Sequence, residues 1–217
     1  MTGAVLWDLD GTLVDSGEYH WLSWRDTMAA EDFHLTYEQF LASFGQKNDR
    51  ILRGWLGDDA PVERIERLGD AKEAEYRRLA REGGLASLPG AAEWVARLQH
   101  FGWRQAVATS APRINVEVML GACGLERFFD TIVSAEDVTV GKPDPQVFQV
   151  AAGRLHTPAE RCIVVEDAAV GIEAARRAGM RCIGVSGAAT LDADIVVTSL
   201  ADLPPDAFVR LLSARRR

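Results

Sequence analysis

Short apolar runs recur along the chain, and turn residues bound each of them. The runs are continuous rather than alternating in polarity, which is typical of strands that are covered on both faces of a parallel sheet. They occupy residues 4–7, 105–108, 131–133, 162–165, 182–185 and 195–197. We therefore expect a parallel sheet that is built from these runs.

Between the later runs, apolar residues recur with the spacing of an α-helix. The expected helices span residues 91–101, 115–123, 146–155 and 168–178. A glycine follows three of these segments, at the position where glycine commonly ends a helix. The alternation of strands and helices indicates an α/β fold of the doubly wound, Rossmann-like class, in which ligands bind at the carboxyl ends of the strands.

The segment that follows the first run breaks this rhythm. It holds no strand-like run, and helical patterns instead cover residues 18–28, 37–43, 49–56 and 62–82. We therefore predict an inserted α-helical domain at residues 16–85. The α/β core would then consist of residues 1–15 and 86–217.

Composition and charge narrow the classes of function and partner. Of the 217 residues, 47% are hydrophobic and 26% are charged, as in an ordinary globular protein, and the net charge is −8. This acidity argues against binding to nucleic acid or to an anionic membrane, and no apolar stretch is long enough to span a membrane. The three cysteines lack metal-ligand spacing, so we expect a reducing, cytoplasmic location. We expect a monomer or a weak homodimer.

The first apolar run leads directly into two aspartates that are separated by one residue. Side chains on a strand alternate between its faces, so Asp8 and Asp10 leave the strand on the same side. Two carboxylates this close need a counter-charge, which in water is usually Mg²⁺. One carboxylate could attack an electrophile while the other moves a proton. Taken alone, the stretch is equally compatible with an acidic turn.

Three further polar groups follow predicted strand ends. Thr109 and Ser110 could bind a phosphoryl oxygen, or they could merely cap the next helix. Lys142 lies in a proline-rich loop that could aim its charge into the site. Glu166 and Asp167 would add two carboxylates, although Asp167 could instead cap a helix. Four carboxylates and one lysine at one edge of the sheet indicate a divalent cation, and the whole set predicts metal-dependent phosphoryl transfer.

With these motifs in this order, the chain resembles the haloacid dehalogenase superfamily, in the branch whose helical cap follows the first motif. The resemblance covers essentially the whole chain, and its most specific parts are residues 8–12 and 164–175. The dehalogenases of the superfamily lack the second aspartate, so Asp10 points to phosphate esters. Within the branch, the chain is similar to β-phosphoglucomutases and related sugar-phosphate phosphatases, through residues 15–20 and the cap residue Lys72.

The resemblance implies a mechanism for the core residues. Asp8 would attack phosphorus and become an aspartyl phosphate, while Asp10 would protonate the leaving alcohol and then deprotonate the next nucleophile. Mg²⁺ would be held by Asp8, the backbone carbonyl of Asp10, Asp167 and Glu166. The transferring phosphoryl group would be bound by Thr109, Ser110 and Lys142.

The resemblance also implies that the helical cap closes over the site and contacts the leaving group. The expected cap contacts are His20, Trp24, Lys47, Asn48 and Lys72. Without the resemblance, His20 would be equally compatible with a histidine on a helix surface, and Trp24 with a residue of the cap core. Lys72 lies in a heavily charged helical segment, so its residue type alone would indicate a solvated lysine.

Two fates of the phosphoenzyme remain open at this point. Transfer to water makes a phosphatase, whereas transfer to a second sugar hydroxyl makes a mutase, which needs a second anion site. This chain has Asn48 where the mutase pattern has an arginine, and Ala111 and Arg113 also depart from that pattern, whereas His20 and Lys72 match it. We predict a phosphatase that acts on a small phosphorylated metabolite, with β-phosphoglucomutase as the alternative. A non-catalytic phosphoacceptor switch domain is a remote further alternative.

Overall fold

The computed structural model describes residues 3–187 and 190–213. Within these residues, six parallel strands form one sheet in the order β3-β2-β1-β4-β5-β6. The strands are β1 (Ala4–Trp7), β2 (Arg104–Ala108), β3 (Thr131–Val133), β4 (Cys162–Glu166), β5 (Arg181–Val185) and β6 (Ile195–Val197). The predicted parallel sheet is thus confirmed. Its strand order reverses between β1 and β4, which is where ligands bind in doubly wound folds.

The pairing register brings the carboxyl ends of the central strands level with one another. Trp7 of β1 pairs with Val107 of β2 on one side and with Val165 of β4 on the other. The next residues, Asp8 and Glu166, therefore lie at the same edge of the sheet. The residues of β1 are fully buried, as expected for a strand in the middle of a sheet whose two faces are both covered.

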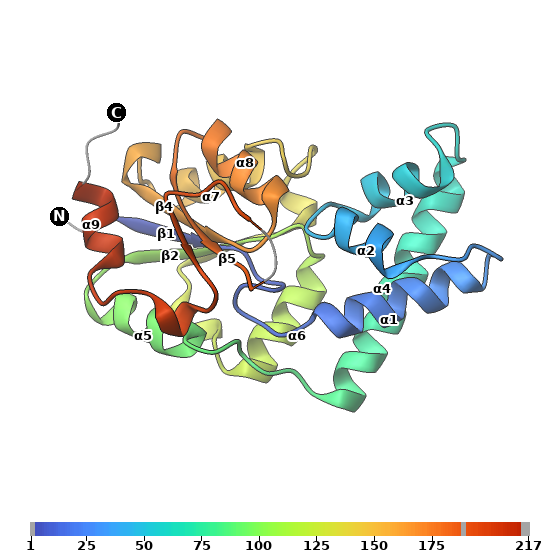
Figure 1. The fold of residues 1–217 in the computed structure, drawn as a ribbon, viewed down its shortest axis with the longest axis horizontal. Helices are drawn as coiled ribbons and strands as arrows, with labels where there is room; N and C mark the ends of the chain where they lie inside the picture. The colour runs from blue at the N-terminus through green and yellow to red at the C-terminus, as the bar shows by residue number, and fades with distance from the viewer. Residues whose placement is uncertain (1–2, 188–189, 214–217) are drawn as a thin grey trace.

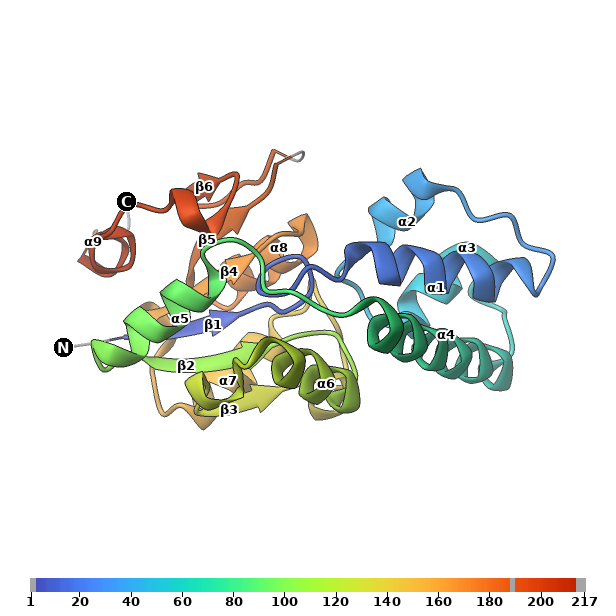
Figure 2. The ribbon, with the colours of Figure 1, turned by 90° about the horizontal axis from the view of Figure 1, so that it is seen from below.

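Helices cover both faces of the sheet (Figure 2). On one face, α5, α6 and α9 contribute to a hydrophobic cluster with Trp94, Met119 and Phe208, and on the other face α7 and α8 contribute Phe148 and Ile172 to a second cluster. These helices are α5 (Ala91–His100), α6 (Arg113–Cys123), α7 (Gln146–Arg154), α8 (Ala169–Arg177) and α9 (Ala207–Ser213). The doubly wound α/β fold is confirmed, and α9 is an addition to the predicted helices.

Single-turn 3₁₀-helices complete the core. They are η1 (Glu126–Phe128), η2 (Ala135–Asp137), η3 (Ala159–Arg161) and η4 (Leu200–Asp202). Each has three residues and lies in a connection between longer elements, which explains why the apolar spacing in the sequence did not predict it. Across the described parts of the chain, no helix combines the length and the apolar character that a membrane span needs.

Four helices between β1 and the rest of the sheet form what we call the helical insert (Figure 1). They are α1 (Gly17–Ala29), α2 (Tyr37–Ser43), α3 (Asn48–Leu56) and α4 (Val62–Gly83). The insert has its own hydrophobic cluster, in which Trp24, Phe40 and Leu52 are buried. The last turns of α4 instead join the cluster of the core through Tyr76 and Ala80. The insert therefore packs internally and also against the core.

Candidate active site

Three acidic side chains meet where β1 and β4 end. Asp8, Glu166 and Asp167 each offer a ligand oxygen, and these oxygens lie within 4.8 Å of one another. The loop after β1 passes very close to this cluster, because a Cβ added to Gly11 would lie 2.2 Å from Asp167 Oδ2. Gly11 also has a φ of +74°, in the left-handed region that side chains disfavour. Glycine is therefore required at the start of this loop.

Lys142 supplies the positive charge in this acidic cluster. Its side chain is buried, and its Nζ donates hydrogen bonds to Asp8 Oδ1 and, at 2.8 Å, to Glu166 Oε2. Burial acts to lower the pKa of Lys142, but the charges of Asp8 and Glu166 outweigh burial and raise it. Lys142 therefore stays charged and holds the carboxylate of Asp8 in place.

The remaining charge of the cluster is negative. Burial and the neighbouring Glu166 raise the pKa of Asp8 to about 8, against the opposing effect of Lys142. Burial, Glu166 and Asp8 likewise raise the pKa of Asp167. In the described part of the chain, one ammonium faces three carboxylates, so ionising all of them leaves two negative charges in excess. Carboxylate oxygens are the ligands that Mg²⁺ prefers, and the cluster fits this ion in charge and chemistry.

Asp10 has a different set of partners. Its Oδ1 accepts hydrogen bonds from Ser16 Oγ at 2.6 Å and from His20 Nε2 at 2.8 Å, and Lys72 Nζ lies 2.8 Å from His20 Nδ1. An ammonium can only donate, so Nδ1 accepts from Lys72 and Nε2 carries the proton that is shared with Asp10. Burial acts to raise the pKa of Asp10, but His20 and Ser16 outweigh burial and lower it. Asp10 is thus ionised, and among the described residues both side-chain hydrogen bonds of its carboxylate use Oδ1.

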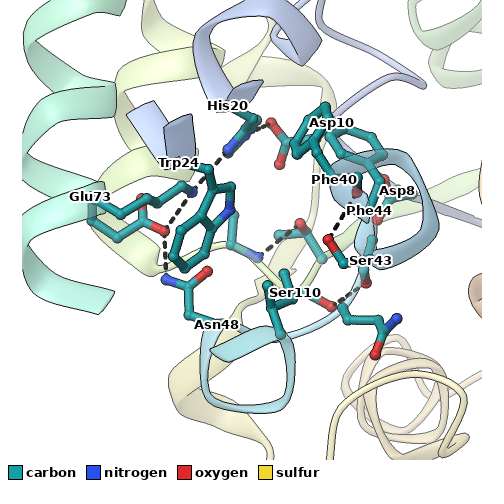
Figure 3. A pocket seen from close by; sticks show the side chains of 16 residues that line it. Asp8, Asp10, His20, Trp24, Phe40, Ser43, Phe44, Asn48, Glu73 and Ser110 are labelled. Carbon is teal, nitrogen blue, oxygen red and sulfur yellow. Dashed lines mark hydrogen bonds and ion pairs between the residues drawn. The ribbon is translucent and has the colours of Figure 1, made fainter. Parts of the chain in front are cut away.

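A pocket lies between these strand ends and the helical insert (Figure 3). Its core side is lined by Asp8, Asp10, Thr109, Ser110 and Ala111. Its insert side is lined by His20, Trp24, Phe40, Ser43, Phe44, Gly45, Gln46, Asn48, Ile51, Lys72 and Glu73. Both predicted catalytic aspartates therefore open onto one pocket, together with four of the five predicted cap contacts. Lys142, Glu166 and Asp167 do not line the pocket. Lys142 donates hydrogen bonds to both Asp8 and Glu166 and so links these two carboxylates.

The predicted contacts on α1 and α4 are buried. His20 is 8% exposed and stacks on the ring of Tyr76 at 4.2 Å, so it is not a surface histidine. Trp24 both belongs to the hydrophobic cluster of the insert and lines the pocket. Lys72 is 2% exposed, and its Nζ lies 5.3 Å from the Trp24 ring, within range of a cation–π contact. A solvated position for Lys72 is thereby excluded.

The loops beside the pocket bind the insert to the core. Thr109 Oγ1 accepts a hydrogen bond from the backbone of Ala111, and Ser110 Oγ donates one to the carbonyl of Gly45 at 2.9 Å. Lys47 was predicted to contact the substrate, but the structure does not bring it to the pocket lining. Its Nζ instead donates to the carbonyls of Ala135 and Val138, at 3.1 and 3.2 Å, because α3 begins directly against this part of the core.

Glu73 is a pocket residue that the sequence interpretation missed. It is 6% exposed, and its Oε1 accepts hydrogen bonds from Asn48 at 2.7 Å and from Lys72 at 2.8 Å. Its Oε2 accepts one from Asn115 of α6 at 2.5 Å. Helical spacing could have found it, because the buried residues of α4 are Ile65, Leu68, Gly69, Lys72, Glu73, Tyr76 and Ala80. This spacing places Lys72 and Glu73 on the buried face.

Comparisons with known proteins agree with this arrangement. A family model for haloacid dehalogenase-like hydrolases matches residues 5–185. The chain is 34% identical to Protein CbbY of Cereibacter sphaeroides, over 94% of both proteins. It is 30% identical to Beta-phosphoglucomutase of Bacillus subtilis, over 92% of this chain and 91% of that protein. It is 29% identical to Validoxylamine A 7'-phosphate phosphatase of Streptomyces hygroscopicus, over 94% of this chain and 96% of that protein.

Solved structures share the fold as well. A mutant of CbbY from Rhodobacter sphaeroides, crystallised in complex with xylulose-(1,5)bisphosphate, matches with a TM-score of 0.83 and 32% identity, over 94% of this chain and 96% of that one. Beta-phosphoglucomutase from Clostridium difficile matches with a TM-score of 0.87 and 26% identity, over 98% of this chain and 97% of that one. Both matches include the core and the helical insert, because they cover nearly the whole chain.

Proposed function

Because this chain belongs to the haloacid dehalogenase-like hydrolases and is a phosphatase of that family, we propose that it hydrolyses a small phosphorylated sugar with the help of Mg²⁺. The observation that carries the proposal is the contrast between its two aspartates. Lys142 Nζ donates a hydrogen bond to Asp8 Oδ1 beside the acidic cluster, whereas Ser16 and His20 bind Oδ1 of Asp10. Both aspartates open onto one pocket, and their different partners suit them to different roles in one reaction.

Asp8 is the nucleophile in this proposal. Its carboxylate attacks the phosphorus atom in line with the leaving oxygen and forms an aspartyl phosphate. Lys142 already contacts Asp8, so its ammonium offsets the charge of the nucleophile and of the phosphoryl group that approaches it. Asp8, Glu166 and Asp167 would hold Mg²⁺, which when bound supplies positive charge to the phosphoryl oxygens.

Asp10 transfers a proton in each of the two steps, first as general acid and then as general base. An arriving phosphate dianion places negative charge beside Asp10 and acts to raise its pKa, which favours the proton that the leaving alcohol needs. After the alcohol departs, the carboxylate takes a proton from the water that attacks the phosphoenzyme. His20 and Ser16 both bind Oδ1, so they leave Oδ2 for the substrate and fix the orientation of the group.

The surroundings of the pocket favour water over a second sugar hydroxyl as acceptor. A mutase intermediate has two phosphates, and the second one needs cations. Lys47 is bound to core carbonyls, and the guanidinium of Arg113 is bound to Asp137 at 2.6 Å. β-Phosphoglucomutase remains the second candidate, because the buried pair of His20 and Lys72 matches the pattern of that enzyme.

The test follows β-glucose 1-phosphate with Mg²⁺ and a trace of glucose 1,6-bisphosphate, and it quantifies glucose 6-phosphate and free phosphate together. Hydrolysis of p-nitrophenyl phosphate serves as a general assay of phosphate release. We expect phosphate release, and a loss of roughly a millionfold in Asp8→Asn, the scale for removing a nucleophile. Asp202→Asn changes an exposed aspartate in η4 and is the matched control.

Two outcomes would contradict the proposal in different ways. Stoichiometric glucose 6-phosphate would make the protein a mutase. Turnover in a clean preparation of Asp8→Asn would remove Asp8 as the nucleophile. Phosphate release from p-nitrophenyl phosphate but not from glucose 1-phosphate would keep the phosphatase and exclude this one sugar.

A further inference from the structure

The end of the pocket that faces the insert carries little positive charge. Among the described residues that line the pocket, the charged side chains are Asp8, Asp10, Lys72 and Glu73. Lys72 is thus the one ammonium among them, and it is bound to Glu73 Oε1 at 2.8 Å. His20 lies next to it, and Lys72 Nζ is 2.8 Å from His20 Nδ1. The carboxylate of Glu73 therefore balances the charge of Lys72 at the pocket.

Hydrogen bonds from both parts of the molecule fix the carboxylate of Glu73. Asn48 and Lys72 of the insert bind Oε1, and Asn115 of the core binds Oε2. Asn115 is itself held, because its Oδ1 accepts a hydrogen bond from Arg77 at 3.1 Å. Burial acts to raise the pKa of Glu73, but Lys72, His20 and Asn48 outweigh burial and lower it. Glu73 is therefore a charged group that cannot turn away from the pocket.

This arrangement has opposite consequences for two kinds of leaving group. A second phosphate on the substrate would lie near a fixed carboxylate in a partly buried site, where repulsion between like charges is poorly screened. An uncharged sugar meets Asn48, whose Oδ1 can accept a hydrogen bond from a hydroxyl group. The rings of Trp24, Phe40 and Phe44 add apolar walls against which the C–H groups of a sugar can pack.

We propose that Glu73 determines specificity: it makes the pocket accept the phosphate monoester of an uncharged, polyhydroxylated leaving group and disfavour a substrate with a second phosphate. This inference rests on the proposed phosphatase function, because it names the class of ester that reaches Asp8.

The test compares two ligands as competitors of p-nitrophenyl phosphate hydrolysis, so it works whether or not either ligand is turned over. Inhibition constants, or KM values for a ligand that is hydrolysed, are measured for glucose 6-phosphate and glucose 1,6-bisphosphate. The wild-type protein should bind the monophosphate more tightly. Glu73→Gln should shift the ratio of the two constants toward the bisphosphate by about tenfold, as expected when one nearby like charge is removed.

Control variants separate charge from structure. Asp70→Asn removes the same charge from an exposed position of α4 and should leave the ratio unchanged. Glu73→Asp keeps the charge and should keep the preference for the monophosphate. A purely structural role of Glu73 would change both inhibition constants by the same factor, and the ratio would not move.

The outcomes also separate this inference from the proposed function. A bisphosphate preference in the wild type, or an unchanged ratio in folded Glu73→Gln, would overturn the specificity role alone. If Glu73→Gln does not fold, Glu73→Asp and the wild-type ratio decide the question. Absence of p-nitrophenyl phosphate hydrolysis, or its survival in Asp8→Asn, would instead overturn the phosphatase mechanism on which the inference rests.

Discussion

The strand edge and the helical insert contribute to the same pocket with different charge balances: the edge carries excess negative charge, and the charges of the insert cancel. At the edge, Lys142 pairs with the buried carboxylates of Asp8 and Glu166, Asp167 adds a third carboxylate, and the excess negative charge fits a divalent cation. On the insert side, the charges of Lys72 and Glu73 balance each other, and Asn48 is uncharged. The edge is therefore suited to a metal ion and a phosphoryl group, whereas the insert is suited to an uncharged remainder of the substrate.

The two regions also hold their residues by different means. Asp8 and Glu166 come directly from buried neighbouring strands, so the register of the sheet fixes their separation. The side chains of the insert come from helices that pack on one another, and hydrogen bonds such as those from Lys47 and Asn115 bind the insert to the core. Changes at the edge should therefore affect catalysis and stability strongly, while changes in the insert should affect substrate binding.

Apart from the loss of the nucleophile Asp8, removal of the divalent metal should have the largest effect on activity, and it acts on the edge alone. Treatment with a chelator should lower phosphate release by at least about a thousandfold, since a metal typically contributes several kcal/mol to such a transition state. Mg²⁺ should restore the activity. It should also raise the thermal unfolding midpoint, because it binds the folded state and offsets the negative charge of the cluster.

Asp167→Asn sharpens this prediction. It removes one of the three clustered carboxylates and should weaken Mg²⁺ binding by at least about tenfold, a loss typical of disturbed metal sites. Full activity in the presence of chelator, together with no Mg²⁺ effect on unfolding, would show that the acidic edge serves another purpose.

Most of the edge could be predicted from the sequence, because each of its residues follows an apolar run that ends at the same side of a parallel sheet. The strand positions and the rule of alternating side chains were enough to predict where Asp8, Thr109 and Glu166 lie. The position of the counter-charge was harder to predict, because Lys142 lies in a loop after η2. Only its place among the other motifs indicated that its charge would reach the site, where the structure shows it bound to Asp8.

Less of the insert could be predicted, for reasons that differ between residues. Glu73 looks like one charge among many on α4, and its burial depends on Asn115, which lies 42 positions away on the core. Lys47 lies between two predicted helices, as expected. The direction of its side chain, however, depends on core carbonyls that become neighbours only when the insert packs on the core. Helical patterns locate a helix well, whereas the partners of its polar residues depend on tertiary packing.

A pair of glycine substitutions tests how tightly the edge is held. In α8, a Cβ at Gly171 would lie 2.1 Å from Glu166 Cδ, whereas at Gly153 in α7 a Cβ would meet nothing within 4 Å. Glu166 cannot yield easily, because Lys142 binds it. Gly171→Ala should cost about 1–3 kcal/mol of unfolding free energy, the usual range for overpacking, and should lower activity.

Gly153→Ala is the matched control, because it adds the same methyl group to a helix of equal length. It should stabilise the protein by about 0.4–1 kcal/mol, since alanine restricts the unfolded chain more than glycine does. Chemical unfolding curves measure both variants. Equal stability of the two would mean that Glu166 moves freely, and the contrast between a rigid edge and a docked insert would weaken.

Lys47→Met should have the smallest effect and tests the insert side of the comparison. The stem of Lys47 packs against Gly141, where a Cβ would lie 2.7 Å from Lys47 Cγ, and its Nζ binds two core carbonyls. Loss of these hydrogen bonds should weaken the docking of the insert by about 1 kcal/mol and raise KM about fivefold. Arg50→Met, which removes an exposed cation from the first turn of α3, three residues after Lys47, should change KM little.

The pattern across substrates decides what Lys47 does. If Lys47 only docks the insert, Lys47→Met should raise KM by the same factor for p-nitrophenyl phosphate and for a sugar phosphate, because Lys47 does not line the pocket. If Lys47 contacts the leaving group, Lys47→Met would raise KM for the sugar phosphate alone. That second result would place a free cation beside Asn48 and would break the contrast between a charged edge and a balanced insert, because the insert could then hold a second phosphate after all.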